Sequence, residues 1–173
     1  KYYSRTVVAS AGTSGAYVFK MQSIEDVTRL GGKVVALSLW AKADASKNIS
    51  LEMLQNFGSG GSADVQGIGV AKLALTTSWQ LLTVTFTMPS VSGKTVGANS
   101  YTGLRIWFDC GSDLAGLSGS LGNQSGTFDI ANVQLNYGSV ALPFVPRSFA
   151  DELRLCQRYY LPNVGENCAG YAY

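Results

Sequence analysis

Hydrophobic and polar residues alternate along much of this chain, with the period of two that is typical of half-buried β-strands. In residues 33–42 the apolar Leu37 and Leu39 fall on one side, and Trp40 falls on the other. Residues 49–57 alternate in the same way. The two stretches therefore predict an antiparallel pair with one apolar face and with Trp40 on the opposite face.

The same pattern, interrupted by loops rich in Gly and Ser, predicts an all-β protein. Further strands are expected at residues 1–9, 16–22, 70–75, 79–88, 101–110 and 127–135. The clearest alternation lies in residues 79–88, where Leu82, Val84 and Phe86 are expected to point inward. Short helices are expected at residues 24–30 and 149–160. Eight or so short strands with so little helix predict an antiparallel two-sheet β-sandwich of jelly-roll type.

The composition of the chain changes after residue 139. Residues 142–147 are Pro-rich, and Ser148 then caps an amphipathic helix. We expect residues 1–146 to form the sandwich and residues 147–173 to form a linker helix and the start of a following segment. A helix at the end of a sandwich has little to pack against, which favours a neighbouring subunit or domain as its partner.

The strand at residues 101–110 carries the best candidate binding group. Strict alternation places Tyr101, Arg105, Trp107 and Asp109 together, opposite the apolar residues of the strand. Aromatic rings can stack on the apolar face of a sugar while charged groups hydrogen-bond to its hydroxyls. The alternative is an Arg105–Asp109 ion pair with Trp107 packed beneath a loop.

Trp40 completes the predicted carbohydrate-binding face, and it has a simpler explanation as well. A Trp flanked by small and charged residues on a strand can be a ligand platform, or it can be a half-buried ring that seals the edge of a sheet. Residues 111–126 form a long Gly-rich loop after Trp107, and we expect this loop to wall the groove.

Composition and charge exclude several functional classes. The 173 residues contain no His, which removes Ser-His-Asp and Cys-His catalysis and His-ligated zinc. The net charge of +2 comes without a basic cluster, so no nucleic acid is expected as a partner, and no apolar run is long enough for membrane insertion. Glu52 and Asp109 are the only acids on sides expected to face a ligand, and nothing in the sequence pairs them as a glycosidase requires. We predict a non-catalytic protein.

Several segments resemble a family of bacteriophage tail-fibre and tail-spike proteins. They are residues 32–42, 55–62, 77–80, 119–135 and 152–160, and the last two are the most specific. The resemblance implies a jelly-roll domain similar to carbohydrate-binding modules, followed by a linker helix into the distal part of the fibre. It also implies a homotrimer, contacts with other tail proteins, and a place in the virion tail after synthesis in the host cytoplasm.

The chain departs from this family in two ways. Relatives carry an upstream stretch with Arg-Gly and Asp-Arg-Trp motifs that is missing here, so we expect both ends to be cut. Related modules often hold a structural calcium at paired acids in the last strand, whereas Ala131 and Asn132 occupy the corresponding positions. Asp129 is a candidate oxygen ligand, but a single carboxylate supplies few of the six to eight oxygen ligands that Ca²⁺ takes. No cofactor is therefore assigned.

Two functions follow from these expectations. The first is a receptor-recognition module that binds a host surface glycan through Trp40, Tyr101, Arg105 and Trp107. The second is a structural module in which the sandwich and the linker helix serve trimer assembly, with host binding located elsewhere in the fibre.

Overall fold

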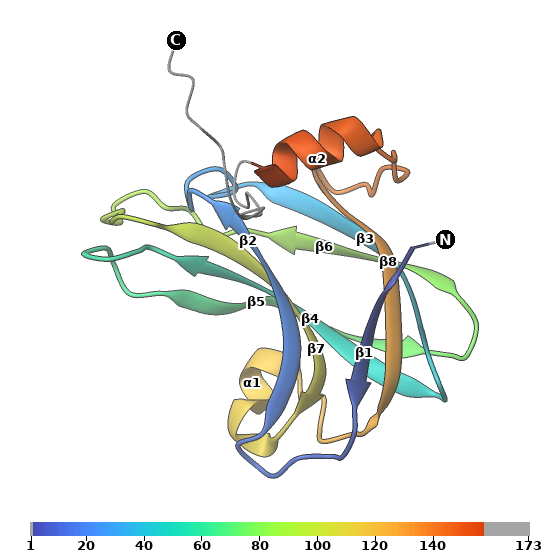
Figure 1. Ribbon diagram of the computed structural model, residues 1–173. Coiled ribbons are helices and arrows are strands. Elements are labelled where there is room, and N and C mark those ends of the chain that lie inside the picture. The colour runs from blue at the N-terminus through green and yellow to red at the C-terminus, as the bar shows by residue number, and fades with distance from the viewer. Residues whose placement is uncertain (1, 158–173) are drawn as a thin grey trace, which may run out of the picture.

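The computed structural model describes residues 2–157, which form two antiparallel four-stranded sheets packed face to face (Figure 1). The strands are β1 Ser4–Val8, β2 Tyr17–Glu25, β3 Val34–Ala43, β4 Lys47–Asn56, β5 Val65–Leu75, β6 Gln80–Thr87, β7 Tyr101–Cys110 and β8 Gly126–Tyr137. Sheet A has the order β1-β8-β3-β6, and sheet B has the order β2-β7-β4-β5. The all-β sandwich predicted from the alternation is confirmed.

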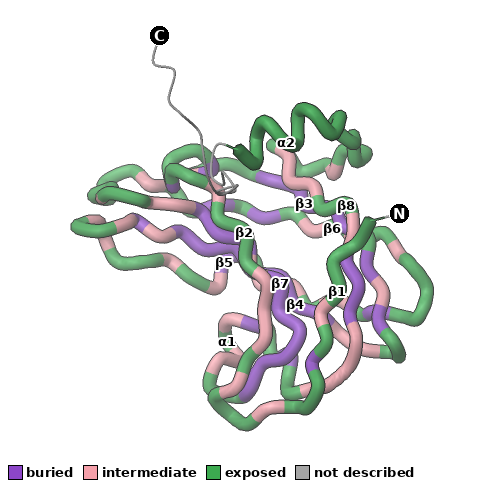
Figure 2. Tube along the Cα trace, in the orientation of Figure 1, coloured by how far each residue is buried: buried purple, intermediate pink, exposed green. Residues whose placement is uncertain are grey.

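The core lies between the two sheets, where the inward-facing side chains of both meet. Figure 2 shows buried residues along β3, β4 and β7. Leu37 and Leu39 of β3 are fully buried, and so is Phe86 of β6. Thr83 and Thr85 of β6 are exposed, as alternation predicts. β3 and β6 therefore each have one face in the core and one outer face.

The predicted pairing of residues 33–42 with residues 49–57 is wrong. β3 pairs with β6 and β8 in sheet A, whereas β4 pairs with β5 and β7 in sheet B. The apolar faces of β3 and β4 meet across the core instead of lying side by side. Alternation defines which face of a strand is apolar, but it does not define which strand is the neighbour.

Two other predicted elements also differ from the structure. Residues 24–30 form no helix, because Ile24 and Glu25 continue β2 and pair with β7. Asp26 then adopts a positive φ of 65° and accepts a hydrogen bond from the Thr28 backbone N–H, which starts a turn. The strand predicted at residues 70–75 begins earlier, because residues 65–69 also belong to β5, whose irregular register accommodates two glycines with positive φ.

The predicted long loop after β7 contains short helices, and the predicted helix near the C-terminus is present in the described residues. Residues 111–126 include a 3-10 helix, Ser112–Leu114, and the short helix α1, Ala115–Ser118, which contacts β5, β4 and β7 of sheet B. The predicted C-terminal helix is present as α2, Phe149–Gln157, and its predicted last residues, 158–160, lie outside the described residues. No helix within residues 2–157 is long and apolar enough to cross a membrane.

Candidate functional site

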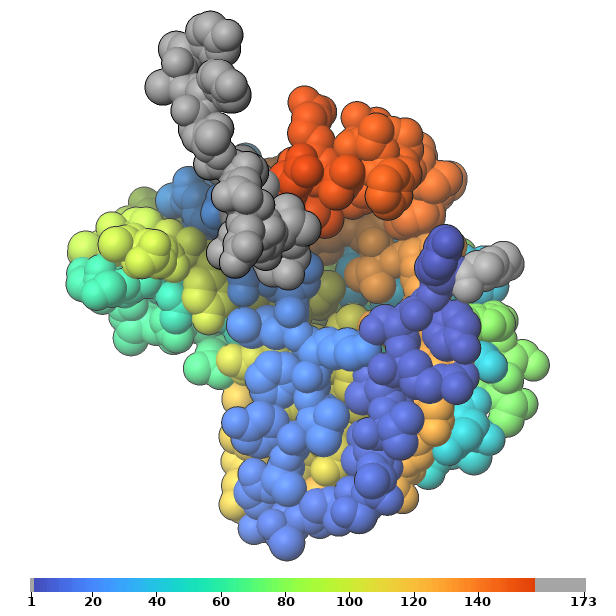
Figure 3. Space-filling model, viewed as in Figure 1, coloured from blue at the N-terminus to red at the C-terminus, as the bar shows by residue number. Residues whose placement is uncertain are grey.

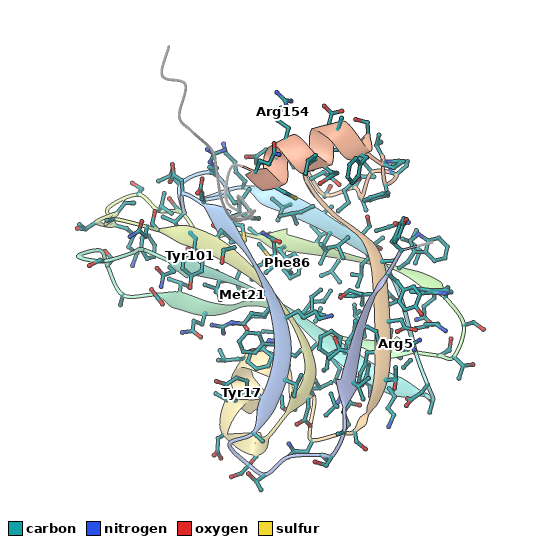
Figure 4. All side chains as sticks on the ribbon, in the orientation of Figure 1. Arg5, Tyr17, Met21, Phe86, Tyr101 and Arg154 are labelled. Atoms are coloured by element: carbon teal, nitrogen blue, oxygen red, sulfur yellow. The ribbon has the colours of Figure 1, made fainter. Side chains whose placement is uncertain are left out.

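The five predicted site residues do not lie on one face. Trp40 lies on the outer face of sheet A, whereas Tyr101, Arg105 and Trp107 lie on the outer face of sheet B. The labelled side chains show the separation: Arg5 of sheet A lies on the other side of the view from Tyr17 and Tyr101 of sheet B (Figure 4). The prediction of a single face was wrong because β3 and β7 belong to different sheets. The two outer faces are therefore described separately.

On sheet B, Trp107 is a packing residue. The residue is 1% exposed, and it packs with Cys110 and Leu121 beneath the segment that follows β7. Phe19 meets the ring edge to face, with centroids 4.9 Å apart. The loop that was expected to wall a groove therefore covers Trp107, which was the alternative interpretation of this residue.

Glu52, on the neighbouring strand β4, holds this arrangement together. Its side chain is fully buried and accepts hydrogen bonds from Trp107 Nε1 at 3.0 Å and from the Gly67 backbone N–H at 2.8 Å. Arg105 Nη1 lies 3.4 Å from the same carboxylate, and the guanidinium also lies over the Trp107 ring. The ion pair of Arg105 is thus with Glu52, not with Asp109 as the alternative interpretation had it. A carboxylate with three protein donors is occupied by structural contacts.

Asp109 faces away from this group because of a β-bulge. Phe19 pairs with Trp107, but the preceding residue Val18 pairs with Asp109, so Phe108 has no partner of its own in β2. The extra residue reverses the alternation, and Asp109 lies on the side of Val18, which packs against the main core. Asp109 is 2% exposed, and its carboxylate accepts a hydrogen bond from the Gln124 backbone N–H at 2.6 Å.

Tyr101 lies at the other end of β7, paired with Glu25 and Asn56. Six residues of extended strand separate it from Trp107, a distance of about 20 Å. Sheet B therefore presents a sealed cluster around Glu52 and a distant, partly exposed Tyr101.

On sheet A, Trp40 belongs to an open group of aromatic rings. Tyr3, Trp40 and Trp79 line a pocket of about 480 Å³. Trp40 is 38% exposed and Trp79 is 37% exposed, and Tyr3 meets Trp79 edge to face with centroids 5.8 Å apart. We call this the aromatic pocket; Tyr2, Ala131, Asn132, Phe144 and Pro146 complete its lining.

The chain that follows β8 forms one wall of the aromatic pocket. Phe144 and Pro146 of this segment line the pocket, and Phe144 also lines an adjoining pocket of about 400 Å³ that shares Trp40 and Asn132. Gln134 of β8 fixes the segment, because its Nε2 donates to the Leu142 carbonyl at 3.0 Å and its Oε1 accepts from the Val145 N–H. The pocket is thus built from strands β3 and β8 together with segments that flank β1, β6 and β8.

Charged side chains lie beside the aromatic pocket. Asp129 of β8 accepts two hydrogen bonds from Arg5, at 2.8 and 2.9 Å, and its carboxylate lies 3.6 Å from Lys42 Nζ. The hydrogen bonds from Arg5 are the main reason that the pKa of Asp129 lies below its ordinary value. Arg5 also lies over the Tyr3 ring, and Lys42 lies over the Trp79 ring.

These charges also bear on the candidate calcium ligand. Both carboxylate oxygens of Asp129 face cationic side chains, whereas Ca²⁺ needs a shell of oxygen ligands. No group of three or more acids or cysteines within residues 2–157 is placed to hold a metal ion. Asp129 is a partner of Arg5 and Lys42 in this structure.

The sequence prediction missed two of the three central rings of the aromatic pocket. The alternation of residues 79–88, with Thr83 facing outward, already places Trp79 on the same outer face. The alternation of residues 1–9 likewise places Tyr3 on the side of Arg5. That the two rings adjoin Trp40 depends on the strand order, for which the sequence carries no local signal.

Comparisons with known proteins agree with this architecture. Residues 5–103, more than half of the chain, match the family model CBM_4_9, described as a carbohydrate binding domain. No curated protein matches the chain.

Solved structures with a similar fold include one entitled "CBM4 structure and function", with a TM-score of 0.53, 21% identity, and coverage of 79% of this chain and 71% of the other. The N-terminal cellulose-binding domain of β-1,4-glucanase C from Cellulomonas fimi has a TM-score of 0.50 and 16% identity, with coverage of 81% and 90%. The baseplate tripod of bacteriophage Tuc2009 has a TM-score of 0.45 and 16% identity, with coverage of 86% and 51%. The first two likenesses show the fold, and the family match shows that this chain belongs to the CBM_4_9 carbohydrate-binding domain family.

Proposed function

We propose that this chain is a non-catalytic receptor-recognition module of a phage tail fibre or tail spike, and that it binds host surface glycans through the aromatic pocket on sheet A. The observation that carries the proposal is the group formed by Tyr3, Trp40 and Trp79, three partly exposed rings that line one concave site. Such rings offer flat apolar surfaces on which a sugar ring can stack.

The shape of the pocket and its polar groups fit this role. A volume of about 480 Å³ lies within the range of small-ligand sites. Asn132 in the lining supplies an amide that can hydrogen-bond to sugar hydroxyls. The placement in a phage tail rests on the resemblance of residues 119–135 and 152–160 to tail-fibre sequences.

The acids predicted to face a ligand do not support hydrolysis. Glu52 is fully buried among three donors, and Asp109 is 2% exposed on the other side of β7. A glycosidase needs two carboxyl groups that reach the same glycosidic bond. We therefore assign binding, and no catalytic step, to this module.

A binding assay with matched variants tests the proposal. The assembled protein is applied to an array of bacterial surface polysaccharides as wild type, as Trp40→Ala and as Trp79→Ala. Tyr17→Ala serves as the control, because Tyr17 is an exposed aromatic residue on sheet B. We expect each Trp variant to bind about thirtyfold more weakly or worse, as for a truncated aromatic hot spot, while the control binds like the wild type. Wild-type binding in both Trp variants, with each folded and assembled, would rule out the aromatic pocket as the site.

A structural role in assembly is the second candidate function, and α2 is the observation that favours it. Phe149, Leu153 and Leu155 are all exposed on this helix, which stands on the surface of the sandwich at the top of the view (Figure 3). A short helix with exposed apolar side chains gains stability when copies pack together. We propose that α2 contributes to a homotrimer.

A further inference from the structure

We propose, on the basis of the function proposed above, that the aromatic pocket prefers glycans carrying a negatively charged group, such as the carboxylate of a uronic acid. The observation behind this inference is a pair of cations, Arg5 and Lys42, that flank one carboxylate at the edge of the pocket. The proposal specifies the class of ligand that the site selects.

The cations lie next to the rings on which a sugar would stack. Lys42 and Trp40 are two residues apart on the same face of β3, a spacing of about 7 Å. Lys42 Nζ lies 5.6 Å from the centre of the Trp79 ring, and Arg5 Cζ lies 5.4 Å from the centre of the Tyr3 ring. A charged substituent on a sugar bound over these rings is therefore within reach of either cation.

The two cationic side chains are more exposed to solvent than the carboxylate that they contact. The side chain of Asp129 is 4% exposed, whereas those of Arg5 and Lys42 are 52% and 30% exposed. The carboxylate lies behind its two partners, and the pair of cations exceeds it by one positive charge. An anion approaching sheet A at this point meets positive charge first.

Both cations keep donors for a ligand. Arg5 uses Nε and Nη2 on Asp129, so its third nitrogen, Nη1, stays available. The contact between Lys42 and Asp129, at 3.6 Å, is longer than a hydrogen bond, so the ammonium also has protons to donate. A guanidinium and an ammonium side by side can bind a carboxylate or a phosphate.

Among the described residues, Asp129 is the one acid that forms an ion pair with these two cations. Neither the aromatic pocket nor the adjoining pocket has a charged residue among its described lining residues, and Arg5 and Lys42 lie at the edge of the aromatic pocket, over the Tyr3 and Trp79 rings. Asp44, the residue that follows β3, accepts a hydrogen bond from the Thr127 backbone N–H. Asp44 is therefore engaged with this backbone N–H, and it lies farther along the chain from Trp40 than Lys42 does.

Matched pairs of glycans test the preference. Bacterial surface polysaccharides that carry carboxylates are immobilised in native form and after reduction of the carboxylates to hydroxymethyl groups. Phosphorylated polysaccharides are immobilised before and after removal of their phosphate. Dissociation constants are measured for the assembled protein at 50 and 500 mM NaCl. The variants are Lys42→Gln and the conservative Lys42→Arg. Lys33→Gln is the control, because Lys33 is an exposed lysine that precedes β3.

We expect tighter binding to the native member of a pair, and a loss of affinity at high salt. Lys42→Gln should weaken binding to the acidic glycan about tenfold more than it weakens binding to the neutral form, the equivalent of one charge-assisted hydrogen bond. Lys42→Arg should restore the preference, and Lys33→Gln should behave like the wild type. The carboxylate and phosphate pairs identify which anion is recognised.

The other outcomes separate this inference from the function on which it rests. Equal binding to native and neutralised glycans, still lost in Trp40→Ala, overturns the preference for anions and leaves glycan binding at the aromatic pocket in place. Binding to no glycan, or binding that survives both Trp40→Ala and Trp79→Ala, overturns the proposed function and this inference with it.

Discussion

Replacing Glu52 with Gln tests whether sheet B is a sealed structural face. Glu52 Oε1 accepts the Gly67 N–H at 2.8 Å, and Oε2 accepts Trp107 Nε1 at 3.0 Å. Gln keeps the shape of the side chain but replaces one acceptor oxygen with an amide donor. Either Gly67 or Trp107 must then face another donor in a buried site.

The size of the expected loss in the free energy of unfolding follows from these contacts. A buried donor without an acceptor costs about 1–3 kcal/mol. The substitution also removes the charge opposite Arg105, whose side chain is only 16% exposed, so solvent compensates little. We expect Glu52→Gln to lower the free energy of unfolding by about 2–4 kcal/mol, a large part of the 5–15 kcal/mol that stabilises a typical domain.

Urea denaturation at neutral pH measures this change. With a denaturant slope of about 2 kcal/mol per molar, the midpoint should fall by about 1–2 M. Glu152→Gln is the matched control, because Glu152 forms an exposed ion pair with Arg147 that should contribute less than about 1 kcal/mol. Glycan binding by folded Glu52→Gln should equal that of the wild type. A variant as stable as the wild type that has lost glycan binding would refute this reasoning and move the ligand site to sheet B.

Two further predictions concern α2 and the charges on sheet A. Leu153→Asp combined with Cys156→Asp should leave the sandwich folded and yield monomers in light scattering, because both residues are exposed and lie three positions apart, on one face of α2. Trimers that persist would exclude α2 as the assembly element. The lowered pKa of Asp129 means that its ionised form stabilises the fold above the ordinary carboxyl pKa, and that this contribution is lost as the pH falls through the lowered value. The free energy of unfolding should therefore fall more between pH 5 and pH 2 in the wild type than in Asp129→Asn. The difference should be about 1 kcal/mol, because Arg5 is half exposed to solvent. Equal acid sensitivity in the two proteins would contradict a stabilising role of the ionised Asp129.

The local pattern of the sequence determined the strands and their faces. Alternation in residues 79–88 placed Leu82 and Phe86 inward and Thr83 outward, and the structure agrees. The same rule placed Trp40 on an outer face, where it lines the aromatic pocket. These predictions succeed because the direction of a side chain in a regular strand depends only on its position along that strand.

The tertiary structure alone decided which faces adjoin and which are covered. Trp40 and Trp107 are both outward-facing tryptophans of alternating strands, yet one lines a pocket and the other is buried beneath the segment around α1. A single bulge between Trp107 and Asp109 was enough to reverse the side on which Asp109 lies. Strand order, bulges and covering loops arise from contacts between residues far apart in the chain, which a local pattern of hydrophobic and polar residues does not encode.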